Sequence, residues 1–136
     1  MIVIKFGGHA MTDPSGKFAA VIKKYLDSGE QCVIVHGGGP QIDHALNTHQ
    51  LESTFVGGFR VTTPEIFAIV QQVLTGTVLR EVVGHLRAYD VPAVGISGRD
   101  GGTLKATVLK TLIDGSAADL GRVGEVCQVD TALLRS

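Results

Sequence analysis

The stretch that decides the fold of this chain is Val33-Ile34-Val35-His36-Gly37-Gly38-Gly39-Pro40. Its three β-branched residues are typical of a strand that is covered on both faces. The three glycines let the backbone come within bonding distance of a ligand, because no Cβ intervenes. Pro40 suits the first position of a helix, where its missing N–H costs little. This strand, glycine loop and helix predict an anion site, most commonly for phosphate; a tight turn without a ligand is the alternative.

A second corner of the same kind opens the chain. Residues 1–6, Met-Ile-Val-Ile-Lys-Phe, are rich in strand-forming types and end in Gly7-Gly8. Lys5 is the only charged residue of this strand. Lys5 is either an edge lysine whose ammonium reaches water, or a cation directed at the anion that the glycines bind. The presence of the second glycine corner at residues 36–39 favours the functional interpretation.

The order of elements predicts that the two corners lie together. Residues 13–28 have helical spacing, with Thr12 or Asp13 as the N-cap and Pro14 just inside, and residues 31–35 form the next strand. A strand, helix and strand in this order form a crossover between parallel strands. Ligands of open α/β folds bind at the carboxyl edge of such a sheet, where both glycine corners would meet.

The hairpin predicted at residues 54–62 carries an isolated cation. Gly57-Gly58 forms its turn, and Arg60 lies among Phe55, Phe59 and Val61. A guanidinium in apolar surroundings favours a carboxylate or phosphate, which it binds through two parallel hydrogen bonds. By composition alone, a surface arginine on a hairpin is the alternative.

The remaining elements follow from periodicity. We expect a short helix from residue 40 to about 50, with His44 and His49 solvated. Residues 64–89 carry two helical patterns, the first capped by Thr63, which form either two helices or one long helix with a kink at Gly76. The other predicted elements are a parallel-type strand at 93–96, strands of a meander at 104–112 and 122–129 linked by residues 114–116, and the start of a helix at 130–134.

Composition limits the function classes. The chain has 136 residues, 44% hydrophobic and 18% charged, which suits one α/β domain with a core. A net charge of −1 and 5% aromatic residues argue against nucleic acid and anionic lipid as partners. Cys32 and Cys127 lie in apolar surroundings without a metal or disulfide pattern, so we expect them to be buried thiols in a reducing compartment. No apolar run is long enough to span a membrane, and the chain opens directly with a strand, which together favour the cytoplasm.

Four motifs follow one another along the chain: Ile-Lys-Phe-Gly-Gly at 4–8, His-Gly-Gly-Gly-Pro-Gln-Ile-Asp at 36–43, Gly-Gly-Phe-Arg-Val-Thr-Thr at 57–63 and Gly-Ile-Ser-Gly-Arg-Asp-Gly-Gly at 95–102. Together these motifs resemble the amino acid kinase family. The hairpin motif is most similar to the acetylglutamate kinase branch and its aminoadipate-type cousins. The resemblance implies an α/β fold, a three-layer αβα sandwich around a mainly parallel sheet. The activity it implies is ATP- and Mg-dependent phosphorylation of the γ-carboxylate of N-acetyl-L-glutamate, in arginine biosynthesis.

The resemblance also implies roles for single residues. Lys5 would stabilise charge on the phosphoryl group in transit, and the N–H of Gly8 would bind the same group, with Gly7 and Gly37 supporting the loops. Gly38 and Gly39 would line the substrate site near the γ-carboxylate. Arg60 would hold the α-carboxylate. No metal-binding residue is expected in the chain.

The resemblance covers the whole chain but corresponds to the N-terminal half of such an enzyme. The family's second half supplies an Asn, an Asp, a second catalytic Lys and the nucleotide-binding region, and none has a counterpart here. We therefore expect residues 1–136 to be an N-terminal substrate-binding domain that is inactive alone. Dimeric relatives meet through the helices equivalent to residues 64–89, so a homodimer is expected.

Two other functions fit the same residues. One is an aminoadipate-type kinase of the same family, which acts in lysine biosynthesis. The other is a non-catalytic amino-acid-binding domain that retains the effector site without the nucleotide half. A plain dinucleotide-binding domain fits poorly, because residues 36–39 lack the G-x-G-x-x-G spacing and no acidic residue ends the following strand.

Overall fold

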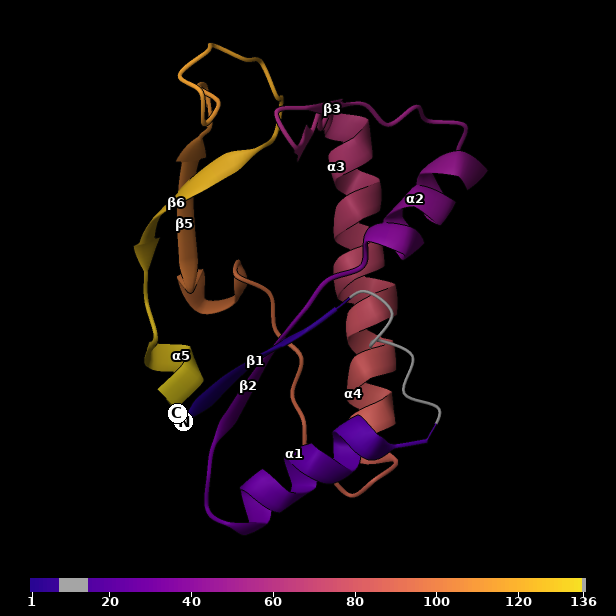
Figure 1. Cartoon of the computed structure of the whole chain (residues 1–136), viewed down its shortest axis with the longest axis vertical. Helices are drawn as coiled ribbons and strands as arrows, with labels where there is room; N and C mark the ends of the chain where they lie inside the picture. Colours follow the sequence, from indigo (N-terminus) through magenta and orange to yellow (C-terminus); the bar gives the residue numbers. More distant parts are fainter. Residues whose placement is uncertain (8–14, 136) are drawn as a thin grey trace.

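The computed structural model describes residues 1–7 and 15–135. Helices and strands are mixed along the chain, which confirms the α/β class (Figure 1). The elements are β1 (Ile2–Phe6), α1 (Lys17–Asp27), β2 (Cys32–His36), α2 (Gly39–Thr48), β3 (Phe55–Val56), β4 (Phe59–Arg60), α3 (Pro64–Gln71), η2 (Gln72–Val78), α4 (Leu79–Arg87), η3 (Asp100–Gly102), β5 (Leu104–Val108), β6 (Gly124–Val129) and α5 (Ala132–Arg135).

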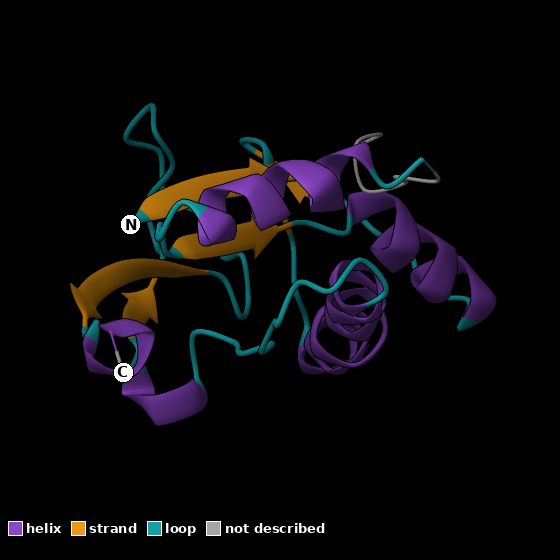
Figure 2. Cartoon of the chain, turned by 90° about the horizontal axis from the view of Figure 1, so that it is seen from below, coloured by secondary structure: helices purple, strands orange, loops and turns teal. Residues whose placement is uncertain are grey.

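The predicted crossover is present. Strands β1 and β2 pair in parallel, in a register that runs from Ile2 opposite Cys32 to Phe6 opposite His36. Helix α1 connects them, and Figure 2 shows it lying along the two strands. Helix α1 begins at Lys17 after Gly16, whose φ of 66° lies in the left-handed region. The caps predicted at residues 12–14 lie outside the described residues.

The two faces of the β1–β2 sheet have different surroundings. Phe6 is buried, and its ring stacks on Phe18 of α1 with the ring centroids 3.9 Å apart. Ile4 and Ile34 pack against the same core. The opposite face carries Val3, which is 68% exposed, and Val35, which is 52% exposed. Within the described residues helices therefore cover one face of this sheet, and the predicted three-layer sandwich is not confirmed.

The long helix of the molecule runs from Pro64 to Arg87 as α3, η2 and α4, and Figure 2 looks down its axis. The N–H of Ile66 donates to Thr63 Oγ1 over 3.3 Å, which confirms the predicted N-cap. Instead of a kink at Gly76, the helix has a π-helical stretch at Gln72–Val78. Ile66, Val73, Val78, Val82 and Leu86 lie in the hydrophobic core.

Against the expectation that no apolar run is long enough to span a membrane, this helix is the one described element that is long and apolar enough to do so. This criterion is weak support for a membrane protein, because a core helix of a soluble protein meets it as well. Its buried side chains belong to the same core cluster as Ile22 of α1 and Leu46 of α2, and 28% of its most apolar stretch is buried inside the molecule.

The prediction of a strand at residues 93–96 is wrong. The segment forms no ladder: Pro92 has no N–H to donate, and Val94 is 90% exposed. The Arg80 guanidinium donates to the carbonyl of Gly95 over 3.2 Å, so a side chain takes an acceptor that a strand would use. Gly95 also packs directly on Leu79, which holds the segment against α4.

The remaining strands form two antiparallel pairs, β3 with β4 and β5 with β6. The first pair confirms the hairpin that turns at Gly57-Gly58. The second is shorter than predicted, and its side chains are exposed along both strands. Cys127 on β6 is therefore exposed, against the prediction that it is buried, because no described element packs over this ribbon.

Candidate functional site

The two glycine corners lie side by side at the carboxyl edge of the parallel sheet. The N–H of Gly37 donates to the carbonyl of Phe6 over 3.2 Å, so the loop after β2 is bonded to the end of β1. A Cβ placed on Gly7 would lie 3.9 Å from the nitrogen of Gly37. The predicted convergence is confirmed for Gly7 and Gly37. Gly8 lies outside the described residues.

Helix α2 presents its N-terminus at this edge. The helix begins at Gly39, and the N–H of Ile42 makes its first backbone bond to the carbonyl of Gly38, over 2.9 Å. Helix geometry leaves the N–H groups of the first turn without intrahelical acceptors, and the helix dipole adds positive potential there. Pro40, at one of the first helical positions, has no N–H to leave unsatisfied.

Gly38 packs closely against the long helix. A Cβ at this position would lie 2.8 Å from Leu74 Cδ2 and 3.3 Å from Val78 Cγ2, both in the π-helical stretch. A Cβ at Gly37 or Gly39 would meet nothing within 4 Å, and both residues are exposed. The buried glycine therefore seats the loop on η2, and its two neighbours face open space.

Arg60 on β4 is held by three contacts. Its Nη2 donates to Asp43 Oδ1 of α2 over 2.7 Å, and its Nη1 donates to Ser53 Oγ. The guanidinium carbon lies 4.6 Å from the centre of the Phe55 ring. The Arg60 side chain is only 15% exposed. The guanidinium thus has a carboxylate partner, as predicted, and that partner is Asp43 of the same chain.

Asp43 is a site residue that sequence reasoning missed. It follows Gly39 by four positions, so the two lie one above the other on the same face of α2. Its signal was present in the motif His-Gly-Gly-Gly-Pro-Gln-Ile-Asp, where the last residue is one helical turn from the last glycine. Through Asp43, the hairpin cation is tied to the helix that carries the glycine loop.

Lys5 lies two residues before Gly7 and is exposed. Strand alternation places it with Val3 and Val35, on the face opposite buried Phe6. Among the contacts of the described residues, its ammonium has no hydrogen bond or ion pair. The structure therefore brings Lys5 to the same edge of the sheet as Gly7 and Gly37.

A third polar loop follows the segment at 93–96. The carboxylate of Asp100 accepts from the N–H and Oγ of Ser97, over 2.6 and 2.8 Å. These hydrogen bonds hold the pKa of Asp100 below its ordinary value. Arg99 in the same loop donates to the side chain of Gln71 over 2.7 Å, which connects the loop to α3.

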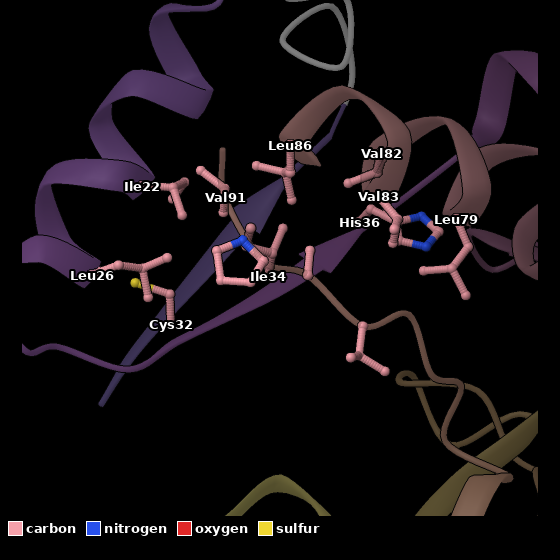
Figure 3. Close-up of a pocket in the computed structure, with 13 residues that line it drawn as sticks. Ile22, Leu26, Cys32, Ile34, His36, Leu79, Val82, Val83, Leu86 and Val91 are labelled. Atoms are coloured by element: carbon pink, nitrogen blue, oxygen red, sulfur yellow. The ribbon is translucent and has the colours of Figure 1, made fainter. Parts of the chain in front are cut away.

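A cavity of 150 Å³ lies elsewhere, on the core face between α1, β2 and α4 (Figure 3). Its walls are apolar apart from Cys32 and His36, and the segment Val91–Val94 closes it. Among the described residues of the two glycine corners, His36 at the end of β2 is the one that lines it. Among the described residues no group of three acidic, histidine or cysteine side chains could hold a metal ion.

Comparison with known proteins identifies the family. The sequence profile of the amino acid kinase family matches residues 1–136. The chain belongs to the amino acid kinase family. It is 47% identical to an acetylglutamate kinase of Acidothermus cellulolyticus over 99% of this chain and 46% of that relative. It is 50% identical to one of Paenarthrobacter aurescens over 96% of this chain and 42% of that relative. The chain thus spans less than half the length of these curated kinases.

Two solved structures share the fold. The smu.665 protein of Streptococcus mutans superposes with a TM-score of 0.85 at 30% identity, over 98% of this chain and 52% of that one. N-acetylglutamate synthase of Neisseria gonorrhoeae, complexed with coenzyme A and N-acetyl-glutamate, gives 0.72 at 28% identity, over 98% of this chain and 30% of that one. The family's fold therefore occurs both in kinases and in a synthase.

Proposed function

We propose that this chain is the N-terminal, amino-acid-binding part of an acetylglutamate kinase, which transfers the γ-phosphoryl group of ATP to the γ-carboxylate of N-acetyl-L-glutamate. The observation that carries the proposal is the hydrogen bond from Arg60 to Asp43 of α2. It holds a guanidinium beside the helix whose N-terminus follows the glycine loop. A cation and a set of backbone N–H groups can each bind one carboxylate, which suits a dicarboxylate. Similarity to acetylglutamate kinases over nearly the whole chain supports this substrate.

The proposed chemistry needs positioning more than proton transfer. A γ-carboxylate is ionised at neutral pH and is a nucleophile without a general base. Arg60 would hold the α-carboxylate, and the N–H groups of Gly38 and Gly39 would lie near the γ-carboxylate. Lys5, with Gly8, would stabilise the charge of the phosphoryl group as it moves. Gly7 and Gly37 would support the two loops.

ATP would bring the magnesium ion, because Mg²⁺ is commonly bound through substrate phosphates and only one or two protein carboxylates. The described residues do not form a metal site of their own, so no step is assigned to the ion. Because the chain matches less than half of the kinases' length, we expect it to bind the amino acid and not to turn over ATP by itself.

The finer organisation is part of the same proposal. The fold would be completed as a three-layer αβα sandwich, in which further structure covers the exposed face of Val3 and Val35. We place the protein in the cytoplasm, as a homodimer through residues 64–89, with neither nucleic acid nor membrane as a partner.

Titration calorimetry with the 136-residue chain tests the proposal. We expect N-acetylglutamate to bind, and Arg60→Ala to weaken binding about 30-fold or more, because a charge-assisted pair costs roughly 2–3 kcal/mol to lose. The matched control is Arg87→Ala, an exposed arginine at the end of α4. Equal affinities for wild type and Arg60→Ala would contradict the role of Arg60.

A non-catalytic amino-acid-binding domain is the second candidate. The structural similarity to a synthase that was crystallised with N-acetyl-glutamate favours it, because this chain matches only 30% of that protein, where the fold is one part of a larger chain with another activity. An aminoadipate-type kinase remains the alternative within the family. Competition between N-acetylglutamate and N-acetylaminoadipate separates these substrates.

A further inference from the structure

Arg60 has a fixed place because two oxygen acceptors and one ring hold it. Asp43 and Ser53 each accept from one of its terminal nitrogens, and the Phe55 ring lies against the guanidinium plane. Asp43 belongs to α2 and Ser53 to the loop before β3. The side chain is therefore fixed from two sides before any ligand arrives.

These contacts leave the guanidinium able to bind another carboxylate. A guanidinium has five N–H donors, and Asp43 and Ser53 each take one. Three donors remain, on Nε, Nη1 and Nη2, which is sufficient for a bidentate pair. The charge of Asp43 offsets that of Arg60, so net attraction for an anion is reduced and binding depends on the direction of the remaining donors.

The position of Asp43 on α2 fixes how far Arg60 lies from the glycine loop. Asp43 is four residues after Gly39, a rise of about 6 Å along the helix. Helix side chains lean toward the N-terminus, so the Asp43 carboxylate covers the turn that begins at Gly39. Arg60, bonded to that carboxylate, is held about one helical turn or less along α2 from the exposed amides of the loop.

We propose that Asp43 is a positioning residue that sets the chain length of the amino acid this site accepts. The inference rests on the proposed function, in which Arg60 binds one carboxylate and the glycine loop the other. With Asp43 in place, the separation of these two anion sites is set by α2 itself. Without Asp43, Ser53 and Phe55 alone restrain the guanidinium, and dicarboxylates of other lengths fit equally well.

The experiment measures selectivity in the 136-residue chain. Dissociation constants are determined by calorimetry for N-acetylaspartate, N-acetylglutamate and N-acetylaminoadipate, which differ by one methylene each. We expect wild type to favour one length by about tenfold, the usual worth of a methylene. Asp43→Ala should weaken that ligand about tenfold and bring all three within about threefold of each other. Asp43→Asn retains an acceptor oxygen of the same shape and should keep the selectivity.

Two controls separate this role from a structural one. Asp27→Ala removes the carboxylate of a different ion pair, the exposed Lys23–Asp27 pair on α1, and should leave all three affinities unchanged. In ligand-free protein, the Nε–H of Arg60 is followed by nitrogen-15 relaxation. We expect it to be ordered in wild type and Asp43→Asn, and mobile in Asp43→Ala.

Each other outcome rejects a defined statement. If Asp43→Ala keeps the wild-type selectivity, or weakens all three ligands by one factor, Asp43 does not set chain length. If Asp43→Ala binds the preferred ligand more tightly, Asp43 is an internal competitor and the inference is wrong. A wild-type chain that binds none of the three overturns the proposed function, whereas Arg60 mobility still decides whether Asp43 holds it.

Discussion

Gly38 shows how one residue connects the glycine loop to the core. Its missing side chain lets the loop rest on Leu74 and Val78, which belong to the π-helical stretch. The two glycines on either side have open space instead, where a ligand can approach their backbone. The three glycines thus have two different roles: Gly38 packs against the long helix, and Gly37 and Gly39 leave the backbone open.

Gly38→Ala should lower the free energy of unfolding by about 1–3 kcal/mol, because the added methyl group overpacks a site whose nearest atom is 2.8 Å away. Urea denaturation measures the change. Gly39→Ala is the matched control: its Cβ meets nothing within 4 Å, and alanine favours the helix. We expect no loss there. Equal losses for both variants would show that the packing on Leu74 has no special weight.

The pKa of Asp100 also depends chiefly on one neighbouring residue, Ser97. The N–H and hydroxyl of Ser97 stabilise its carboxylate, so the folded pKa lies below the ordinary 3.8. Hydrogen bonding of this kind stabilises the folded loop above about pH 3.8, and the stabilisation is lost as the pH falls through the lower folded pKa. Carbon-13 NMR titration of the carboxyl group should show this pKa rise in Ser97→Ala, which removes one of the two donors. An unchanged titration would contradict the assignment.

The long helix is the element that organises the core, and its beginning can be tested. Thr63→Ala removes the oxygen that accepts from the N–H of Ile66, and should cost about 1 kcal/mol of stability. Thermal or urea unfolding measures it. Thr77→Ala, at an exposed position of the same helix, should be neutral or slightly stabilising, because alanine has the higher helix propensity. A Thr63→Ala variant as stable as wild type would show that the cap contributes nothing.

The elements predicted correctly are those specified by local signals. The cap at Thr63 and the Gly57-Gly58 turn depend on residues close in sequence, and the β1–α1–β2 crossover follows from the order strand, helix, strand. The prediction of a strand at 93–96 was wrong. Its apolar pattern does not reveal that the carbonyl of Gly95 accepts a hydrogen bond from Arg80, fifteen residues away. The π-helical stretch has no sequence signature of comparable strength.

The candidate site shows the same division. The convergence of two glycine corners follows from the parallel topology, and the sequence predicted it. That Arg60 is already paired could not be predicted, because Asp43 and Arg60 are 17 residues apart and meet only when the hairpin packs beside α2. The partner of Arg60 depends on tertiary packing, whereas the glycine loop can be recognised from adjacent residues.

At the scale of the whole molecule, the proposed homodimer is open to a direct test. Gly76 lies on an exposed part of the long helix, and a Cβ there would meet nothing within 4 Å of this chain. Gly76→Arg should therefore leave the monomer folded, while a bulky charge in a self-complementary contact should weaken a dimer through residues 64–89. Sedimentation equilibrium should show wild type as a dimer and Gly76→Arg shifted to monomer, with unchanged circular dichroism.

Ala20→Arg, an exposed position on α1, is the control and should stay dimeric. A monomeric wild type would reject the dimer for this chain. A Gly76→Arg variant that remains fully dimeric would place the contact on another surface.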